Sequence, residues 1–400
     1  IHTWFDLGLF IDRFKEEKEG EYPAIFSHSF EDFEEELRTG GIAFMTFHYM
    51  VDGVTVEVEK YAELISRNIP AIPIHYIAGN FREKVDSLIS DQYKKYEIPE
   101  LAGFNEWPLY HDFFFKHMER GSEDYNALIL KFWNEVLVLV EKLGSYIEQE
   151  QINLMYLINL CSNPGNVSAS LALILLSEYL NIPVINNNHD FYWEGGASEA
   201  VRKQKKMKPG PRDFFFTNAH LGEFFSIIEM LFPWESDKWV NVNINRDQTE
   251  YLVREKGHNP ASVMEIGTAV DTASYTNIDK RRNINAFLQF EKMLARYREQ
   301  LICYSVGDVL KSNLVSESNP RPILIGCKTG PLRNFINENI IFLQPTRIIS
   351  RKRIELGFNL LLKIFENEEI INRFRNTRQL KITLLITGPI AAGHFEYYKK

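Results

Sequence analysis

Cysteine is scarce in this chain, and long apolar runs are missing. The three cysteines, Cys161, Cys303 and Cys327, are widely separated and form no CxxC pair. The sequence therefore predicts no disulfide framework and fits the reducing cytosol best. No uncharged apolar run reaches the length that a bilayer needs, so no transmembrane segment is predicted and a cytoplasmic location is expected.

Basic residues are also fewer than acidic ones, with 45 Lys and Arg against 54 Asp and Glu. The net charge is -9 and the isoelectric point is near 5.7, which argues against a nucleic-acid binder that relies on overall electrostatics. A basic pocket for a nucleotide is still compatible with this balance. Any anion site must therefore be local.

Several catalytic signatures are absent. The chain has no GxGxxG fingerprint, no Walker lysine, no HExxH helix, no GxSxG elbow and no zinc-spaced set of cysteines and histidines. Each of these motifs supplies residues that its chemistry requires. Dinucleotide-dependent oxidoreductases, P-loop NTPases, metalloproteases and α/β-hydrolases consequently lose support, and no metal site is predicted.

The composition is that of a globular protein with room for two domains. Of the 400 residues, 45% are hydrophobic and 25% are charged. The chain opens without a methionine, which suggests a piece of a longer protein. Residues 1–40 are rich in Phe and Glu and carry one predicted helix, Ser29–Arg38. We expect them to form the end of a preceding domain or an N-terminal extension.

Apolar strands alternate with helical patterns across residues 41–275. Predicted strands begin at Ile42, Ile72, Leu154, Ile182, Trp239 and Val263, and the predicted helices are Val54–Asn68, Tyr125–Gln149, Ser168–Leu180 and Arg246–Lys256. This alternation is typical of a parallel sheet covered by helices. Residues 79–108 are polar and irregular, and we expect them to run over the surface.

A second α/β domain is predicted for residues 336–400. It comprises strands at Ile340–Leu343 and Lys381–Thr387 and, between them, a helix at Arg351–Phe365. The charged, weakly periodic residues 276–335 are predicted to be an insertion or linker. Two strands are too few for a doubly wound sheet, so we expect this domain to be incomplete.

Two cations mark the point where the first strand of this second domain turns into its helix. Arg347 and Lys352 follow the turn Gln344–Thr346. Cations at the carboxyl end of a strand, beside a helix amino terminus, suit the diphosphate of a leaving group. The alternative is a solvated basic cluster without a ligand.

A polar and aromatic run follows the strand at Ile182–Asn186. His189 and Asp190 stand directly beyond its carboxyl end, where loops of open parallel sheets carry function. His189 suits hydrogen bonding near neutral pH, but a purely structural histidine is an open alternative. The aromatic residues Phe191–Trp193 are expected to pack in the core, and a wall for a bound sugar is the alternative. Glu194 has possible partners in the cations of Arg202–Lys208.

The loop after the first strand contains a glycine before a helix. Gly53 permits close approach of the backbone to a ligand, and Asp52 or Thr55 is suited to cap the helix. A single glycine is a weak signal. This glycine supports a ligand site only in combination with the segment around His189 and the segment around Arg347 and Lys352.

Together, the three segments resemble the retaining nucleotide-sugar glycosyltransferases of the GT-B fold, in the large family that includes sucrose-phosphate synthase and mannosylglucosylglycerate synthase. The resemblance covers about residues 41–275 and 336–400. It implies an α/β chain with two Rossmann-like domains that face each other across a cleft, the C-terminal one truncated. The segment 276–335 departs from the family pattern, and the family's later Glu-rich motif would lie beyond Lys400.

The resemblance also implies roles for individual residues. His189, Arg347 and Lys352 would be catalytic. The donor-binding residues would be Asp52, Gly53, Asp190, Thr346 and Gly388. Arg347 and Lys352 would stabilise the departing diphosphate, and His189 would face the donor sugar.

The implied activity is transfer of a hexose, with retention of configuration, from a nucleotide sugar such as UDP-glucose or GDP-mannose to a small-molecule or glycan acceptor. No metal and no cofactor are implied, because two fixed cations can replace a metal ion, and no nucleic-acid partner is expected. Two alternatives stay open: a catalytically silent sugar-nucleotide-binding or regulatory module of a larger protein, and a bacterial effector that glycosylates a host target. The truncated donor half predicts weak or no activity for the chain as given.

Overall fold

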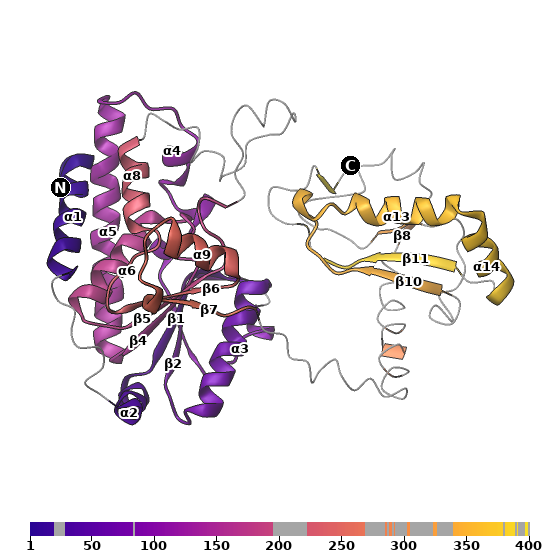
Figure 1. The fold of residues 1–400 in the computed structure, drawn as a ribbon, viewed down its shortest axis with the longest axis horizontal. Helices are drawn as coiled ribbons and strands as arrows, with labels where there is room; N and C mark the ends of the chain where they lie inside the picture. The colour runs from indigo at the N-terminus through magenta and orange to yellow at the C-terminus, as the bar shows by residue number, and fades with distance from the viewer. Residues whose placement is uncertain are drawn as a thin grey trace. The chain divides into compact units, whose positions relative to one another are not determined.

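The computed structural model divides the chain into two compact units, Ile1–Val270 and Asp271–Lys400. It describes residues 1–19, 29–82, 85–194, 222–268, 285, 288–289, 292, 302–304, 323–325, 339–378, 381–388, 390 and 397–398. Both units contain parallel strands connected by helices (Figure 1). The α/β class predicted from the sequence is confirmed.

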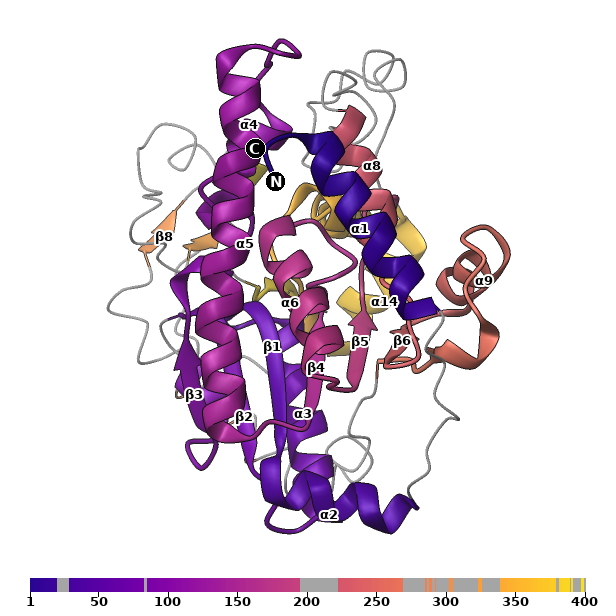
Figure 2. The same ribbon diagram turned by 90° about the vertical axis from the view of Figure 1, so that its left-hand side faces the viewer.

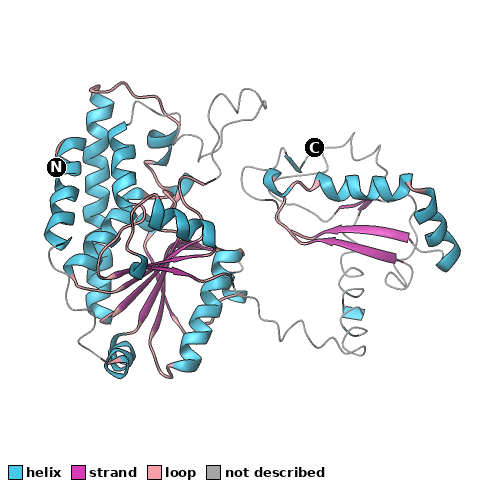
Figure 3. Ribbon diagram, in the orientation of Figure 1, coloured by secondary structure: helices cyan, strands magenta, loops and turns pink. Residues whose placement is uncertain are grey.

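The first unit is built on a seven-stranded parallel sheet with the strand order β3-β2-β1-β4-β5-β6-β7. Its strands are β1 (Ile42–Tyr49), β2 (Ile74–Phe81), β3 (Lys94–Glu97), β4 (Leu154–Ile158), β5 (Val184–Asn188), β6 (Trp239–Asn243) and β7 (Val263–Glu265). Figure 3 shows the strands as one fan between helices. Seven residues of β1 are buried, as expected for a strand with helices on both faces.

Successive side chains along a strand point to opposite faces, and they feed two separate cores. Ala43, Met45 and Phe47 enter one core, whereas Ile42 and Phe44 enter the other. The first core is covered by α1 (Trp4–Glu19), α4 (Tyr110–Phe114), α5 (Glu123–Glu150), α6 (Val167–Tyr179) and α8 (Gly222–Leu231), and the second by α2 (Phe30–Gly40) and α3 (Gly53–Asn68). Figure 2 shows α1, α5 and α6 in front of the sheet. A further helix, α9 (Arg246–Arg254), follows β6.

Residues 1–19, which the sequence predicts as the end of a preceding domain or an N-terminal extension, contribute to the core of the first unit. Trp4, Leu7 and Ile11 follow helical spacing and are buried. The Trp4 ring lies 5.6 Å from that of Phe224 on α8. α2 begins after the N-cap Ser29, close to the predicted start of the helix.

One strand lies in the segment 79–108, where the sequence predicts only irregular structure. The edge strand β3 pairs with β2 alone, and its sequence Lys-Lys-Tyr-Glu is mostly exposed. Charged edge strands protect a sheet from further pairing. An exposed strand of this kind lacks the apolar alternation by which sequence analysis finds strands.

The second unit contains the parallel pair β10 (Asn339–Gln344) and β11 (Lys381–Ile386). The helices α13 (Glu355–Glu366) and α14 (Glu368–Arg378) connect them in the chain. A second parallel pair, β8 (Ile302–Tyr304) and β9 (Ile323–Ile325), lies within residues 276–335, where the sequence predicts an insertion or linker.

The sequence pattern predicts one apolar face of this helix formed by Ile354, Phe358, Leu361 and Leu362, and the structure confirms only part of it. Ile354 is buried and Leu361 is half-buried, whereas Phe358 and Leu362 are each 54% exposed. Leu361 shares the less exposed face with Gly357 and Ile364, spaced as one face of a helix. A Cβ on Gly357 would lie 3.2 Å from Leu384 of β11, so this face points to the strands.

Candidate functional site

The sheet order of the first unit reverses between β1 and β4. β1 connects through α3 to β2 on one side, whereas β4 connects through α6 to β5 on the other. In open parallel sheets, ligands bind beyond the carboxyl ends of the strands at such a point. A ligand site in the first unit is therefore expected at the loops after β1, β4 and β5.

The loop after β1 is fixed by the capping of α3. The Asp52 carboxylate accepts a hydrogen bond from the Thr55 backbone N–H at 3.0 Å, and the Met50 N–H donates to the Thr55 hydroxyl at 3.0 Å. Of the two caps that the sequence offers, Asp52 is the N-cap. Gly53 follows it, and a Cβ there would meet no atom within 4 Å. This backbone therefore borders open space.

The loop after β5 is held by an asparagine that follows β4. Asn159 has a left-handed backbone, with φ 58°, and its side-chain oxygen accepts hydrogen bonds from the N–H groups of His189 at 2.8 Å and Asp190 at 3.1 Å. Gln248 of α9 donates to the His189 carbonyl at 3.1 Å. His189 and Asp190 thus lie at the carboxyl edge, as predicted, on a backbone that is anchored from two sides.

The His189 side chain contacts a buried carboxylate that the sequence analysis missed. His189 Nε2 lies 3.5 Å from Glu57 Oε1, and the two side chains are 15% and 7% exposed. Neither atom has a hydrogen-bond partner among the described residues. Glu57 belongs to the second turn of α3, so the contact joins the helix after β1 to the loop after β5 across β4.

Neutral polar groups surround Glu57. Burial and the Glu57 charge raise the pKa of Tyr61 on the same helix. The Tyr61 ring lies 5.3 Å from that of Tyr156 on β4, whose hydroxyl accepts a hydrogen bond from the Asn187 amide at 3.0 Å. The result is a polar cluster of Glu57, Tyr61, Tyr156, Asn187 and His189 beneath α3.

The aromatic residues after His189 pack in the core, as predicted. Phe191 and Tyr192 are buried, and the Trp193 ring stacks on Phe191 at 4.2 Å and on Tyr251 at 4.8 Å. Glu194 accepts hydrogen bonds from the Phe191 N–H at 2.8 Å and from the Gln248 amide at 3.0 Å. Arg202–Lys208, its predicted partners, lie outside the described residues.

A second histidine lies at the carboxyl end of β1. The His48 side chain is 10% exposed, and its Nε2 is 3.2 Å from the Gly103 carbonyl oxygen. Its Nδ1 lies 3.9 Å from Glu106, which accepts a hydrogen bond from the Asn80 amide at 2.6 Å. Burial lowers the pKa of His48. The sequence analysis missed His48 because the residue sits within the predicted loop without a motif of its own.

The two predicted phosphate-binding cations lie beyond β10 in the second unit. Arg347 and Lys352 are both exposed, and neither has an acidic partner within the part of the chain that the structure describes. Lys352 ends a short 3₁₀ turn, Ser350–Lys352, and not an α-helix as predicted. Arg353, at φ 49°, interrupts the helical backbone before α13 begins at Glu355.

Gly388 fixes the segment that carries Arg347. A Cβ on Gly388 would lie 1.8 Å from the Thr346 carbonyl oxygen and 2.6 Å from the Arg347 nitrogen. A parallel bridge between Ile348 and Ile390 continues this contact. Thr346, Arg347 and Gly388 are thus together in the second unit, whereas Asp52, Gly53, His189 and Asp190 belong to the first.

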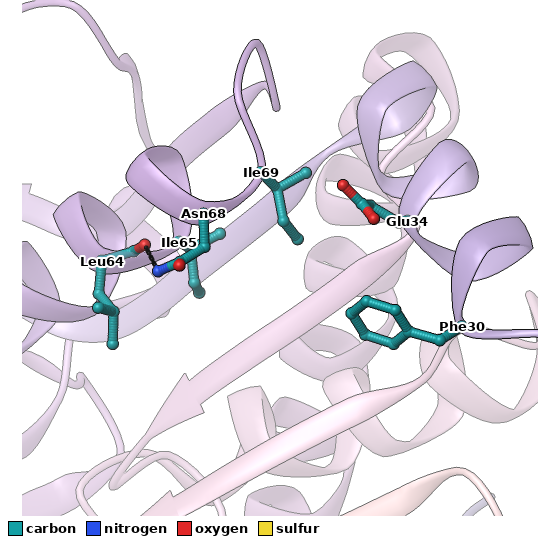
Figure 4. Close-up of a pocket in the computed structure, with 6 residues that line it drawn as sticks. All are labelled: Phe30, Glu34, Leu64, Ile65, Asn68 and Ile69. Atoms are coloured by element: carbon teal, nitrogen blue, oxygen red, sulfur yellow. Dashed lines mark hydrogen bonds between the residues drawn. The ribbon is translucent and has the colours of Figure 1, made fainter.

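A hollow of about 430 Å³ lies between α2 and α3, away from these residues. Phe30 and Glu34 line one side, and Leu64, Ile65, Asn68 and Ile69 line the other (Figure 4). The Asn68 amide donates to the Leu64 carbonyl and so is used within α3. This end of α3 leads into the start of β2, so the hollow is at the opposite edge of the sheet from His189.

Among the described residues, no group of three or more His, Cys, Asp or Glu side chains is arranged to hold a metal ion. No described helix combines the length and apolarity needed to cross a bilayer.

Comparison with known proteins finds distant structural similarity. No protein-family model and no curated protein matches the chain. A glycosyltransferase from Rickettsia africae matches with 12% identity and a TM-score of 0.39 over 90% of this chain and 70% of its own. A UDP-GlcNAc 2-epimerase from Neisseria meningitidis, bound to UDP-GlcNAc, matches with 11% identity and a TM-score of 0.34 over 88% of this chain and 67% of its own.

A UGT transferase from Siraitia grosvenorii, in complex with UDP, has 9% identity and a TM-score of 0.31, over 66% of this chain and 58% of its own. The chain thus spans less than two thirds of this protein. Similarities at this level do not assign an activity, because one fold hosts many functions.

Proposed function

We propose that this chain is a GT-B glycosyltransferase that moves a hexose from a nucleotide diphosphate sugar, such as UDP-glucose or GDP-mannose, to a small-molecule or glycan acceptor with retention of configuration. The observation that carries the proposal is the pair of exposed cations beyond β10. Arg347 and Lys352 have no acidic partner among the described residues, and the loop that bears Arg347 is fixed by Gly388.

The diphosphate of the donor is the ligand that fits this arrangement. Arg347 offers a planar fork of N–H donors, whereas Lys352 offers a compact charge, and both groups suit phosphate oxygens. Ile349 and Ile354 are buried on either side of the 3₁₀ turn, so Lys352 stands on a turn with two apolar anchors. Cations carried on an anchored backbone are suited to stabilise the charge of a leaving group.

His189 is assigned to the donor sugar. It follows β5 at the carboxyl edge, and Asn159 and Gln248 hold its backbone. An imidazole carried on a backbone that is anchored from two sides is suited to orient one sugar hydroxyl. Its removal should therefore lower turnover more than affinity for the donor.

The proposed reaction proceeds on the front face of the sugar without a covalent intermediate on the protein. The bond from the anomeric carbon to the diphosphate oxygen breaks as the acceptor hydroxyl attacks from the same side, and the acceptor proton leaves on the departing diphosphate. Arg347 and Lys352 neutralise the charge that develops on that oxygen. Each contact is worth about 2.7–4 kcal/mol of transition-state stabilisation, by analogy with oxyanion sites.

A transfer assay tests this function. Incubation of the full-length protein with UDP-glucose or GDP-mannose and a panel of sugar and polyol acceptors should give a glycoside with the anomeric configuration of the donor, measured by NMR. Arg347→Ala and Lys352→Ala should each lower kcat by about 10²–10³-fold, whereas Lys363→Ala, which removes an exposed lysine paired with Glu366 on α13, should not. Donor binding without transfer would favour the silent binding module, and an inverted product would contradict retention.

A further inference from the structure

We propose that Glu57 positions the His189 imidazole by accepting a hydrogen bond from its Nε2–H, and that this leaves Nδ1 as the acceptor for a hydroxyl of the donor sugar. The role of Nδ1 rests on the proposed function, whereas the hydrogen bond does not. The assignment comes from the contact between α3 and the loop after β5, where Nε2 and Oε1 are 3.5 Å apart.

Burial makes the pairing favourable. His189 Nε2 and Glu57 Oε1 are both shielded from solvent, and neither has another hydrogen-bond partner among the described residues. A buried polar group without a partner costs about 1–3 kcal/mol, so two such groups facing each other at 3.5 Å favour a small side-chain rotation that closes the bond. No other residue in the described part of the chain is recorded in an ion pair with Glu57.

The chemistry of the two groups fixes the direction of the bond. An ionised carboxylate accepts hydrogen bonds and donates none, so Nε2 must carry the proton. In the neutral ring, Nδ1 then holds the lone pair and can accept from a hydroxyl. No hydrogen bond to Nδ1 is recorded among the described residues.

The groups packed around the pair are uncharged side chains from three elements. Tyr61 lies on α3, Tyr156 on β4 and Asn187 on β5, and the Asn187 amide is already donating to Tyr156. None of the three carries a positive charge, and the Tyr61 hydroxyl is a second possible donor to the carboxylate. The neutral imidazole stabilises Glu57 by donating its Nε2–H to the oxygen that faces it at 3.5 Å.

Glu57 itself stands on a fixed element. Asp52 caps the start of α3, and Thr55 and Val58 on either side of Glu57 are fully buried. The carboxylate is thus held by a helix whose first turns cannot shift without disturbing the core. A positioning group works best on such a rigid support.

The test is the ring N–H signal of His189 in protein with ¹⁵N-labelled histidine, recorded at about pH 8, where an ordinary imidazole is neutral. We expect a protected Nε2–H signal in wild type, assigned by its loss in His189→Gln. Glu57→Gln keeps an oxygen acceptor and should retain the signal, whereas Glu57→Leu should lose it. The exposed Glu63→Gln on the same helix, which removes only a surface pair with Arg67, is the matched control.

A second histidine signal is needed to show that each variant is folded. His75 Nδ1 lies 2.9 Å from the Tyr146 hydroxyl, remote in sequence from the pair, and the His75 signals should stay unchanged in every variant. Loss of the His189 signal in Glu57→Leu with intact His75 signals supports the proposal. Persistence of that signal in Glu57→Leu, or a wild-type proton on Nδ1, overturns it.

Turnover supplies the second readout. Glu57→Leu should lower kcat by about 10–100-fold, as loss of supporting hydrogen bonds does at metal sites. The KM for the donor should change little. The kcat of Glu57→Gln should lie between those of Glu57→Leu and wild type. The N–H signal requires no sugar, so it tests the hydrogen bond even if no nucleotide sugar is turned over. A signal that behaves as expected, with transfer unaffected by His189→Gln, would contradict the role of His189 and leave the pairing intact.

Discussion

Replacing Gly388 by alanine should disturb the proposed phosphate site from a distance. The new Cβ would lie 1.8 Å from the Thr346 carbonyl oxygen, whereas ordinary contacts begin near 3.4 Å. The loops after β10 and β11 must therefore separate by about 1.6 Å, the difference between these two distances. Overpacking of this kind costs about 1–3 kcal/mol of the free energy of unfolding.

The same displacement moves Arg347, whose backbone nitrogen lies 2.6 Å from the added atom. Misplacement of a catalytic group by about 1 Å can lower the rate about 10²-fold. We expect Gly388→Ala to melt earlier than wild type in a thermal scan and to lose most of its affinity for UDP and GDP, measured by calorimetric titration.

Gly53→Ala is the matched control for stability. A Cβ on Gly53 would meet no atom within 4 Å, and alanine in the first turn of a helix is at least as favourable as glycine, by up to about 1 kcal/mol. Its unfolding temperature should equal or exceed that of wild type. Equal stability of Gly388→Ala and wild type, or a comparable loss in Gly53→Ala, would refute this reasoning.

Two further predictions concern stability. Asp52→Ala removes the cap that accepts from the Thr55 N–H and should cost about 1 kcal/mol in urea unfolding; an unchanged midpoint would show that α3 does not need this cap. Burial lowers the pKa of His48, His75 and His258 from 6.5, so below that pH the unfolded chain binds protons that the folded chain does not. The free energy of unfolding should therefore fall as the pH drops from about 6.5, by at most ~1.4 kcal/mol per pH unit for each histidine, and His75→Gln should reduce the slope.

The sequence predicted the sheet well because its central strands are buried on both faces. The strands predicted to begin at Ile42 and Leu154 are mostly apolar, and the structure confirms both starting points as those of β1 and β4. β3 escaped prediction because its exposed lysines carry no such signal. α1 escaped because apolar residues such as Phe5 and Leu9 also lie on its exposed side, which obscures the helical periodicity of the covered face.

The sequence identified the backbone of the candidate site but not its side-chain partners. His189 and Asp190 were found because they follow a strand, and a strand end is visible in the sequence. Glu57 and Asn159 were missed because their contacts with His189 join residues far apart in the chain. Such contacts depend on the order of strands in the sheet, which hydrophobic periodicity does not encode.

The most direct test of the account is calorimetric titration of UDP, GDP, UDP-glucose and GDP-mannose into the wild-type protein, Arg347→Ala, Lys352→Ala and the control Lys363→Ala. The account predicts binding of at least one of these nucleotides to wild type and to Lys363→Ala, and a loss in both Arg347→Ala and Lys352→Ala of about 1.5–3 kcal/mol, the range for hydrogen bonds to charged groups. Equal affinity of all four proteins, or no binding to a folded wild type, would contradict a diphosphate site beyond β10.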